Sequence, residues 1–347
     1  MKNEIIYEKE KVNNFYIDNP NLIFKKLLNI NDASFQGFCL NRFDYFVLNK
    51  IIYIAVPSFF YFSSNPLSIY KLNKFFNFEK IHNLEGHKKP IILVKNFFDE
   101  KKNKNYLLTS DAFPLVLIWE IENENSIKIK YTISIYYTGE ILSALILFES
   151  INKIILTSTD KSLNSCEFSF NSGNFIKYIE GTKHETYYIL EYQNNIIELC
   201  LDKIHIYNIL NESEEYVIKN EYTKDKNICG CINENILYVN NFSHGRILII
   251  DLNNNSIINT INTNHSDNLF SLMKWNNDYL IGTDIKNHCL YIIDILNRRI
   301  INKIKTKCEP RHIKRIFLDK DLYQIDNILL ILDNKLAFEI WISRNSI

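Results

Sequence analysis

The chain has eight histidines and seven cysteines, the side chains with the widest chemical repertoire, but neither type forms a recognisable set. Only Cys229 and Cys231 are close in sequence, and no second pair or flanking histidine completes four zinc ligands. A glycine-rich phosphate loop, a Gly-x-Ser-x-Gly turn and a His-Glu-x-x-His motif are absent from the sequence. We therefore expect no metal site, no cofactor and no enzymatic activity, and we expect the cysteines to be free thiols.

Basic side chains form the next group with a chemical use. Arg311, Lys314 and Arg315 lie in a basic segment near the carboxyl end, and Lys88 and Lys89 lie in an earlier one. Positive charges of this kind speed encounter with an acidic partner. Lys plus Arg and Asp plus Glu both total 40, so the chain has no net charge, which argues against binding nucleic acid over much of its surface. A local basic patch is still compatible with this balance.

A third group is the aromatic run Phe59, Phe60, Tyr61 and Phe62, which precedes Pro66. Aromatic side chains dominate the energy of protein interfaces when they are exposed. The same residues could instead extend a strand or fill a gap in the core. Both interpretations are open, and the exposed one makes Phe59–Phe62 a candidate contact for a partner.

The elements that must position these residues repeat along the chain. Seven short apolar segments are centred on large side chains, which are Tyr70, Trp119, Phe168, Tyr207, Ile250, Ile293 and Trp341. Successive centres are separated by 49, 49, 39, 43, 43 and 48 residues. A period of about 40–45 residues with four strands in each unit is typical of a β-propeller. We expect an all-β, seven-bladed propeller.

The segments around each centre predict the remaining strands. A second apolar run precedes the centre in six units, as in 106–110 and 327–332, and an alternating segment such as 126–130 follows it. No strand can follow Trp341, because it lies six residues from the carboxyl end. We expect Leu22–Leu28 to supply the missing outer strand and close the ring, since an open ring would expose an unpaired edge. Residues 21–347 then form the propeller, and 1–20 form an N-terminal arm.

Asparagine is expected to replace glycine in many turns, because the chain has only eight glycines. Asn tolerates positive φ and bonds its own backbone, and Asn253–Asn255 and Asn276–Asn277 separate apolar runs. No run of about 18 apolar residues is present, so we expect no membrane span. The amino-terminal residues are not of the secretory type, and we expect an intracellular protein, cytoplasmic or nuclear.

One unit resembles a repeat of the WD-repeat family. Gly86-His87 opens it, and Trp119-Glu120 ends it, with Glu120 in place of the family's aspartate. The resemblance implies a buried hydrogen-bond chain of His87, a hydroxyl from Thr109 or Ser110, and Trp119. The tight-turn aspartate of the family is not in its usual place here, because Phe113-Pro114 intervenes. The other six units match the pattern only partly, although the resemblance covers about 325 residues.

Two functions from different classes follow. The first is a non-enzymatic scaffold or adaptor subunit that binds an unidentified protein, because a rigid ring presents many loops. Its expected binding face carries Lys88, Lys89, Arg311, Lys314 and Arg315, with Phe59–Phe62 nearby. The second is a propeller that binds phosphoinositide or nucleic acid through the same basic residues. The pair Arg298-Arg299 does not favour it, because the flanking residues predict a turn before an outer strand.

Overall fold

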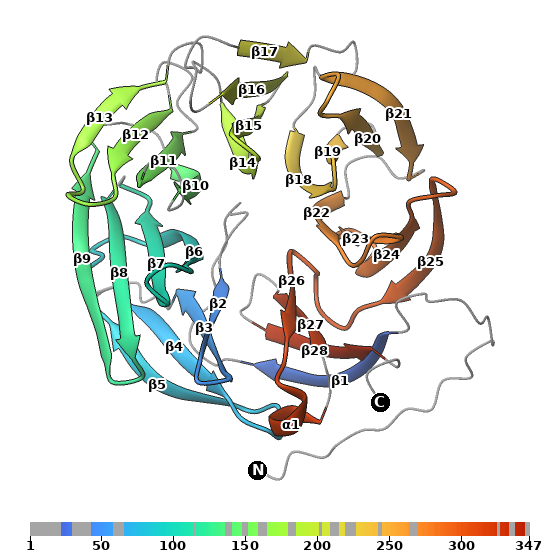
Figure 1. Cartoon of the computed structure of the whole chain (residues 1–347). Helices are drawn as coiled ribbons and strands as arrows, with labels where there is room; N and C mark the ends of the chain where they lie inside the picture. The colour runs from blue at the N-terminus through green and yellow to red at the C-terminus, as the bar shows by residue number, and fades with distance from the viewer. Residues whose placement is uncertain are drawn as a thin grey trace.

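The protein is described here from a computed structural model, shown in Figure 1. The described residues are 22–29, 43–57, 66–113, 115–135, 141–147, 152–158, 165–179, 185–200, 203–208, 215–218, 227–241, 245–263, 269–324, 327–332 and 337–343. They form seven four-stranded antiparallel sheets arranged as the blades of a ring. The expected all-β, seven-bladed propeller is confirmed.

Each blade has four strands, numbered from the channel outward. Blade one contains β2 (Asp44–Leu48), β3 (Ile51–Pro57), β4 (Leu67–Leu72) and β5 (Phe78–Leu84). Blade two contains β6 (Ile91–Asp99), β7 (Lys104–Asp111), β8 (Leu115–Asn123) and β9 (Ser126–Ser134). Blade three contains β10 (Ile141–Leu147), β11 (Lys153–Ser158), β12 (Cys166–Ser169) and β13 (Phe175–Tyr178). Blade four contains β14 (Thr186–Tyr192), β15 (Asn195–Cys200), β16 (Ile204–Asn208) and β17 (Glu215–Ile218).

The remaining blades follow the same order. Blade five contains β18 (Asn227–Asn233), β19 (Ile236–Asn241), β20 (Arg246–Asp251) and β21 (Ser256–Asn262). Blade six contains β22 (Leu269–Lys274), β23 (Tyr279–Asp284), β24 (Cys289–Asp294) and β25 (Arg299–Lys305). Blade seven contains β26 (His312–Phe317), β27 (Asn327–Leu332), β28 (Ala337–Ser343) and β1 (Leu22–Asn29). All seven centres of the sequence repeat lie on the third strand of a blade.

The N-terminal strand closes the ring, as the sequence predicts. β1 pairs antiparallel with β28 along its whole length, from Leu22 opposite Ser343 to Asn29 opposite Ala337. Figure 1 shows β1 outside β28, so the last blade combines both ends of the chain. The pairing covers the edge of β28 that would otherwise present unpaired backbone groups.

The core lies between the blades. Each of the seven hydrophobic clusters among the described residues joins two neighbouring blades, because alternate side chains of a strand point to opposite faces of its sheet. Ile54 and Phe338, for example, belong to the cluster that joins blades one and seven. Burial of these apolar faces is the main stabilising term, and each blade depends on both neighbours.

A short helix, α1 (Lys320–Tyr323), adds a second contact between the last and first blades. It lies in the connection from β26 to β27, and Asp319 caps its first turn. The hydroxyl of Tyr323 donates to the carbonyl of Leu72 at 2.9 Å and accepts from the amide of Ile52 at 3.3 Å. Lys50 forms an ion pair with Asp319 at 2.8 Å across the same junction.

Asparagine takes the role in tight turns that its sequence positions predict. Asn49, Asn103, Asn152 and Asn255 all have positive φ, between 47° and 50°, in turns between strands. The side chain of Asn276 also accepts from the amides of Asp278 and Tyr279, at 3.0 and 2.8 Å. These geometries allow tight turns with few glycines.

Candidate functional site

The ring has two faces, which differ in their connections. The face called here the turn face carries the turns from first to second strand and from third to fourth, such as 49–50 and 73–77. The other, called the link face, carries the segments that lead from one blade to the next, such as 85–90. Every inner strand runs from the link face to the turn face.

Blade two contains a buried polar chain at its link-face edge. Nε2 of His87 lies 2.7 Å from the hydroxyl of Thr109, and the indole Nε1 of Trp119 donates to the same hydroxyl at 2.8 Å. Nδ1 of His87 lies 3.1 Å from Oδ2 of Asp111. All four side chains are buried, so the chain orders the blade and presents no reactive group to solvent.

Asp111 corrects the sequence interpretation of this repeat. No turn aspartate was expected in the family's position, because Phe113-Pro114 intervenes, yet Asp111 supplies the carboxylate from the end of β7. Its Oδ1 also accepts from the amides of Phe113 and Leu115, at 3.0 and 3.3 Å. Asp111 therefore accepts from the amides that precede and follow position 114 in the sequence. The hydroxyl in the chain is that of Thr109.

Gly86 packs closely against β8 beside these hydrogen bonds. A Cβ atom at Gly86 would lie 2.7 Å from Cδ1 of Leu117 and 3.5 Å from the indole of Trp119. The glycine of the Gly86-His87 pair therefore allows the link to lie close to β8. This explains its presence without any functional role.

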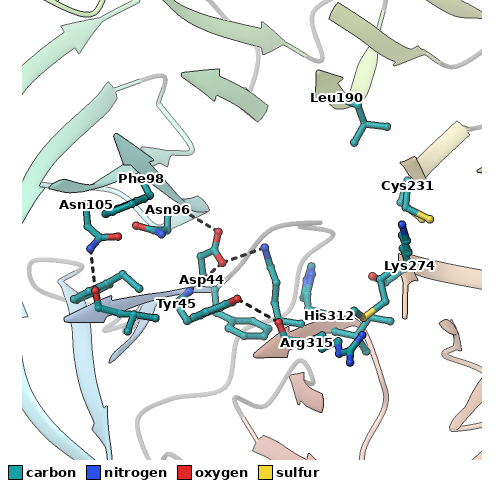
Figure 2. A pocket seen from close by; sticks show the side chains of 18 of the residues that line it. Asp44, Tyr45, Asn96, Phe98, Asn105, Leu190, Cys231, Lys274, His312 and Arg315 are labelled. Carbon is teal, nitrogen blue, oxygen red and sulfur yellow. Dashed lines mark hydrogen bonds and ion pairs between the residues drawn. The ribbon is translucent and has the colours of Figure 1, made fainter. Parts of the chain in front are cut away.

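A cavity of about 950 Å³ occupies the axial channel and reaches the turn face beside blades one and two. Figure 2 shows side chains of the inner strands around it. Asp44 of β2 and Lys314 of β26 meet across the junction of blades one and seven, with Oδ1 and Nζ 3.1 Å apart. Asp44 is 6% exposed, and its Oδ2 accepts from the amide of Asn96 at 2.9 Å.

Arg315 is held by the wall of the channel. Its guanidinium lies over the ring of Trp275, with 4.1 Å from Cζ to the ring centroid, and it also donates to the carbonyl of Trp275. Partial burial lowers the pKa of Arg315. The phenol of Tyr45 donates to the carbonyl of Arg315 at 3.3 Å, and burial, followed by the charge of Asp44, raises its pKa to about 12.

Cys229 and Cys231 lie on β18 and line the same cavity. Burial raises the pKa of the Cys229 thiol to about 12 and also raises that of Cys231. Both thiols therefore stay protonated near neutral pH and are poor nucleophiles. Within the described part of the chain, no three His, Cys, Asp or Glu side chains gather in a way that could hold a metal ion.

Several exposed apolar side chains are at the turn-face ends of the strands. Thirteen large hydrophobic residues are exposed among those described, and six of them are at this end of four consecutive blades. They are Leu296 of blade six, Phe317 and Leu322 of blade seven, Phe75 and Val47 of blade one, and Phe98 of blade two. Leu296, Phe75 and Phe317 are 84%, 69% and 63% exposed. These six residues are called the apolar rim below.

The described segments of the link face carry exposed lysines. Lys88 and Lys89 are exposed in the link from β5 to β6, and the ammonium of Lys89 lies 4.7 Å from the ring centroid of Phe113. Phe113 is 65% exposed and is the one exposed large hydrophobic at the link-face turns that are described. Arg311 precedes β26 at this face and forms an ion pair with Glu309.

Lys314 and Arg315 lie in a different element from the one that the sequence predicts. The sequence places them in a connecting segment, but β26 begins at His312, so both belong to the innermost strand of blade seven. Pairing with β27 along the full length of β26 extends the strand to these residues. Phe59, Phe60, Tyr61 and Phe62 lie outside the described residues, as does the expected arm 1–20.

Sequence reasoning missed the apolar rim and the charged channel wall. Phe75 and Leu296 are single apolar residues in polar turns, and nothing in their local pattern shows that these turns share one face. Knowledge of the strand order, with alternate turns assigned to alternate faces, could have grouped them. In the described segments, no helix has the length and apolar character needed to cross a bilayer.

Comparison with known proteins supports the fold. No protein-family model matches the chain, and no curated protein sequence matches it. Among solved structures, the fold is similar to a chain of the "Crystal Structure of Mitotic Checkpoint Complex" at a TM-score of 0.68 and 12% identity. The match covers 99% of this chain and 97% of that chain. At this identity the likeness concerns the fold, which is a seven-bladed β-propeller.

Proposed function

We propose that this chain is a non-enzymatic scaffold or adaptor subunit that binds a protein partner through the apolar rim. The observation that carries the proposal is that six exposed apolar side chains are at the same end of blades six, seven, one and two. Large apolar side chains that are exposed together mark interaction sites. The most exposed residues of the apolar rim are Phe75, Leu296 and Phe317. Large apolar side chains of this kind are suited to act as anchors for a partner.

Two contacts join blades one and seven close to residues of the apolar rim. Tyr323 bonds the end of blade one, and Lys50 bonds Asp319, so blades one and seven are tied together beside Phe75 and Phe317. These two contacts constrain the relative position of blades one and seven where a partner would bind. Preorganisation of this kind lowers the entropic cost of association.

We also propose that the chain is a divergent WD-repeat protein. The buried hydrogen bonds of His87, Thr109 and Trp119 in blade two support this, because these three residues occupy the positions that the resemblance implies, and Asp111 extends the set. The similarity to a chain solved within a multiprotein complex fits a role in assembly. Neither argument identifies the partner, and the rim is argued from this chain alone.

A second candidate surface is the basic part of the link face. Lys88, Lys89 and Arg311 are at this face, and Lys89 is beside the exposed ring of Phe113. An acidic protein segment, a phosphoinositide headgroup or a nucleic acid would be attracted to these charges. Lys314 and Arg315 add less to this surface, because one pairs with Asp44 and the other stacks on Trp275.

The test compares the two faces in the full chain. The tagged protein is recovered from cells that express it natively, and the proteins that co-purify stoichiometrically are quantified. A triple variant, Phe75→Ser, Leu296→Ser and Phe317→Ser, should lose the partner without a fall in melting temperature, because the three side chains are exposed. Phe113→Ser is the matched control on the link face, since its ring is exposed to a similar degree.

A charge-reversal variant examines the second surface. Lys88→Glu, Lys89→Glu and Arg311→Glu should leave recovery of the partner unchanged if the rim is the binding site. If this variant loses the partner and the triple serine variant retains it, the binding site is on the link face and not at the apolar rim. Salt-dependent binding of the wild type to RNA or phosphoinositide vesicles, abolished by the same reversal, would instead favour the nucleic-acid or lipid function.

A further inference from the structure

The junction of blades two and three holds three aromatic rings around one ammonium group. Nζ of Lys130 on β9 lies 5.1 Å from the ring centroid of Tyr106 and 5.5 Å from that of Tyr131. The ring of Phe170, which follows β12 of blade three, has its centroid 5.4 Å from the same nitrogen. Phe170 meets both tyrosine rings edge to face, at interplanar angles of 85° and 79°. The three rings, called the aromatic cage below, all lie close enough to attract the cation through their faces.

The ammonium of Lys130 makes no hydrogen bond with any residue that the structure describes. Oε2 of Glu120 is 3.6 Å away, which is an ion-pair distance but longer than a hydrogen bond. Oε1 of Glu120 accepts instead from Nζ of Lys104, at 2.7 Å. A primary ammonium has three N–H donors, and the described groups around Lys130 use none of them.

The space between the ammonium and the rings matches the size of a methyl group. An N–C bond is about 1.5 Å long, so a methyl carbon on Nζ that points at a ring would lie about 3.6–4.0 Å from its centroid. Dispersion contact between carbon atoms is most favourable at this separation. Methylation keeps the positive charge of lysine and removes N–H donors that have no acceptor among the described residues. The cage therefore suits a methylated ammonium better than a bare one.

Lys130 is the extra residue of a β-bulge. The pairing of β8 with β9 shifts between Ile118 and Trp119, which leaves Lys130 with no residue opposite. Four other blades have a bulge at the same place, and the extra residue there is always isoleucine, at Ile81, Ile176, Ile258 and Ile301. The bulge by itself therefore does not require a charge, and the cation of blade two corresponds to the cage.

We propose that Lys130 is a site of Nε-methylation and that the aromatic cage of Tyr106, Tyr131 and Phe170 holds the methylated ammonium. The side chain of Lys130 is 22% exposed and has no hydrogen bond to break among the described residues, so it can turn outward to a methyltransferase. The site is separate from the apolar rim and does not depend on the scaffold function.

The methyl group comes from a sulfonium donor that the methyltransferase binds. The deprotonated amine of Lys130 attacks the methyl carbon of this donor. The N–C bond forms as the C–S bond breaks, and the electron pair of the broken bond stays on sulfur, which becomes a thioether. The proton that nitrogen loses passes to water. Once the side chain returns, its methyl groups contact rings of both blades and strengthen their junction.

Mass spectrometry of the natively expressed chain tests whether the modification is present. Fragmentation of the peptide that contains Lys130 should locate methyl groups on this residue. Lys128 is exposed two residues earlier on the same strand, and it should be unmodified because it is not in the cage. Recovery of this peptide only in its unmodified form would overturn the proposal.

Replacement of Lys130 by Nε,Nε-dimethyllysine, through genetic-code expansion in the full chain, tests the cage directly. The melting temperature should rise by about 2 °C or more, because the methyl groups fill the space below the rings. The same replacement at Lys128 is the matched control and should leave the melting temperature unchanged. No rise at position 130, or an equal rise at both positions, would contradict a cage for the methylated form.

Tyr131→Leu separates the cage from a general effect of methylation. The rise caused by dimethyllysine at position 130 is measured against the unmethylated chain with the same Tyr131→Leu change, so any loss of stability in the variant cancels. The rise should shrink by at least about a third, since one of three rings is removed. Tyr178→Leu, at an exposed tyrosine of β13, should keep the full rise. A full rise in Tyr131→Leu would show stabilisation without the cage and would overturn the proposal.

Discussion

The imidazole of His87 and the carboxylate of Asp111 lie 3.1 Å apart inside blade two, and both side chains are excluded from solvent. His87 belongs to the link that enters the blade, and Asp111 ends its second strand. Their contact therefore fixes the link against the turn that Asp111 caps. With Thr109 and Trp119 they form one polar chain whose members all depend on their neighbours.

Replacing His87 should destabilise the whole ring. His87→Ala leaves Asp111 and Thr109 without their shared partner in a buried site, and the free energy of unfolding should fall by about 1–3 kcal/mol. Urea unfolding followed by tryptophan fluorescence measures the loss. His82→Ala, at a half-buried histidine of β5, is the control and should cost less. Equal losses in the two variants would contradict a special role for the buried chain.

Trp119 combines packing with hydrogen bonding, and two substitutions separate them. Trp119→Ala should reduce the free energy of unfolding by about 3–5 kcal/mol, because it leaves a cavity between blades one and two. Trp119→Phe keeps an aromatic ring but removes the donor to Thr109, so its cost should be smaller. Thermal unfolding at matched protein concentration gives both values, and an equal effect of Ala and Phe would contradict the packing argument.

Deletion of residues 1–30 should open the ring. It removes β1 and exposes the edge of β28, which pairs with β1 from Leu22 to Asn29. The free energy of unfolding should fall by several kcal/mol, so the melting temperature should fall by more than about 5 °C. Aggregation should increase, because the edge of β28 is exposed. Deletion of residues 1–12 keeps β1 and should have a much smaller effect. Identical melting temperatures for the full chain and the 1–30 deletion would contradict closure by β1.

The depressed pKa of Lys95 predicts a specific dependence of stability on pH. The pKa is about 8 in the folded chain and near 10.5 when the chain is unfolded. Between these values the unfolded chain binds a proton at Lys95 that the folded chain has lost, so stability rises with pH in this window. Lys314, Asp44 and Glu191 face Lys95 and set the folded value together with burial.

The measurement is the difference in unfolding free energy between the wild type and Lys95→Met at pH 7.5, 8.5 and 9.5. The difference should change in favour of the wild type as pH rises, by up to about 1.4 kcal/mol per pH unit. Lys89→Met, at an exposed lysine, should show a flat difference over the same range. A flat difference for Lys95→Met would show that Lys95 keeps an ordinary pKa.

The sequence by itself determined the number of blades, the order of their strands and the closing role of β1. These features depend on local patterns, because the alternation of a strand and the asparagines of a turn are encoded by adjacent residues. The centres from Tyr70 to Trp341 all lie on third strands for this reason. The seventh outer strand, which pairs with the strand of Trp341, is β1 from the other end of the chain.

Only the tertiary structure decided which side chains meet. Lys314 and Arg315 line the channel cavity because β26 begins at His312, and that boundary depends on pairing with β27. Asp111 reaches His87 only when the turn at Phe113 folds back over the link. Phe75 and Leu296, which are 221 residues apart, lie on one face because each is in the turn from the third to the fourth strand of its blade, and the ring places these two blades on either side of blade seven. These placements depend on how strands pair and turns fold, and adjacent residues in the sequence do not encode them.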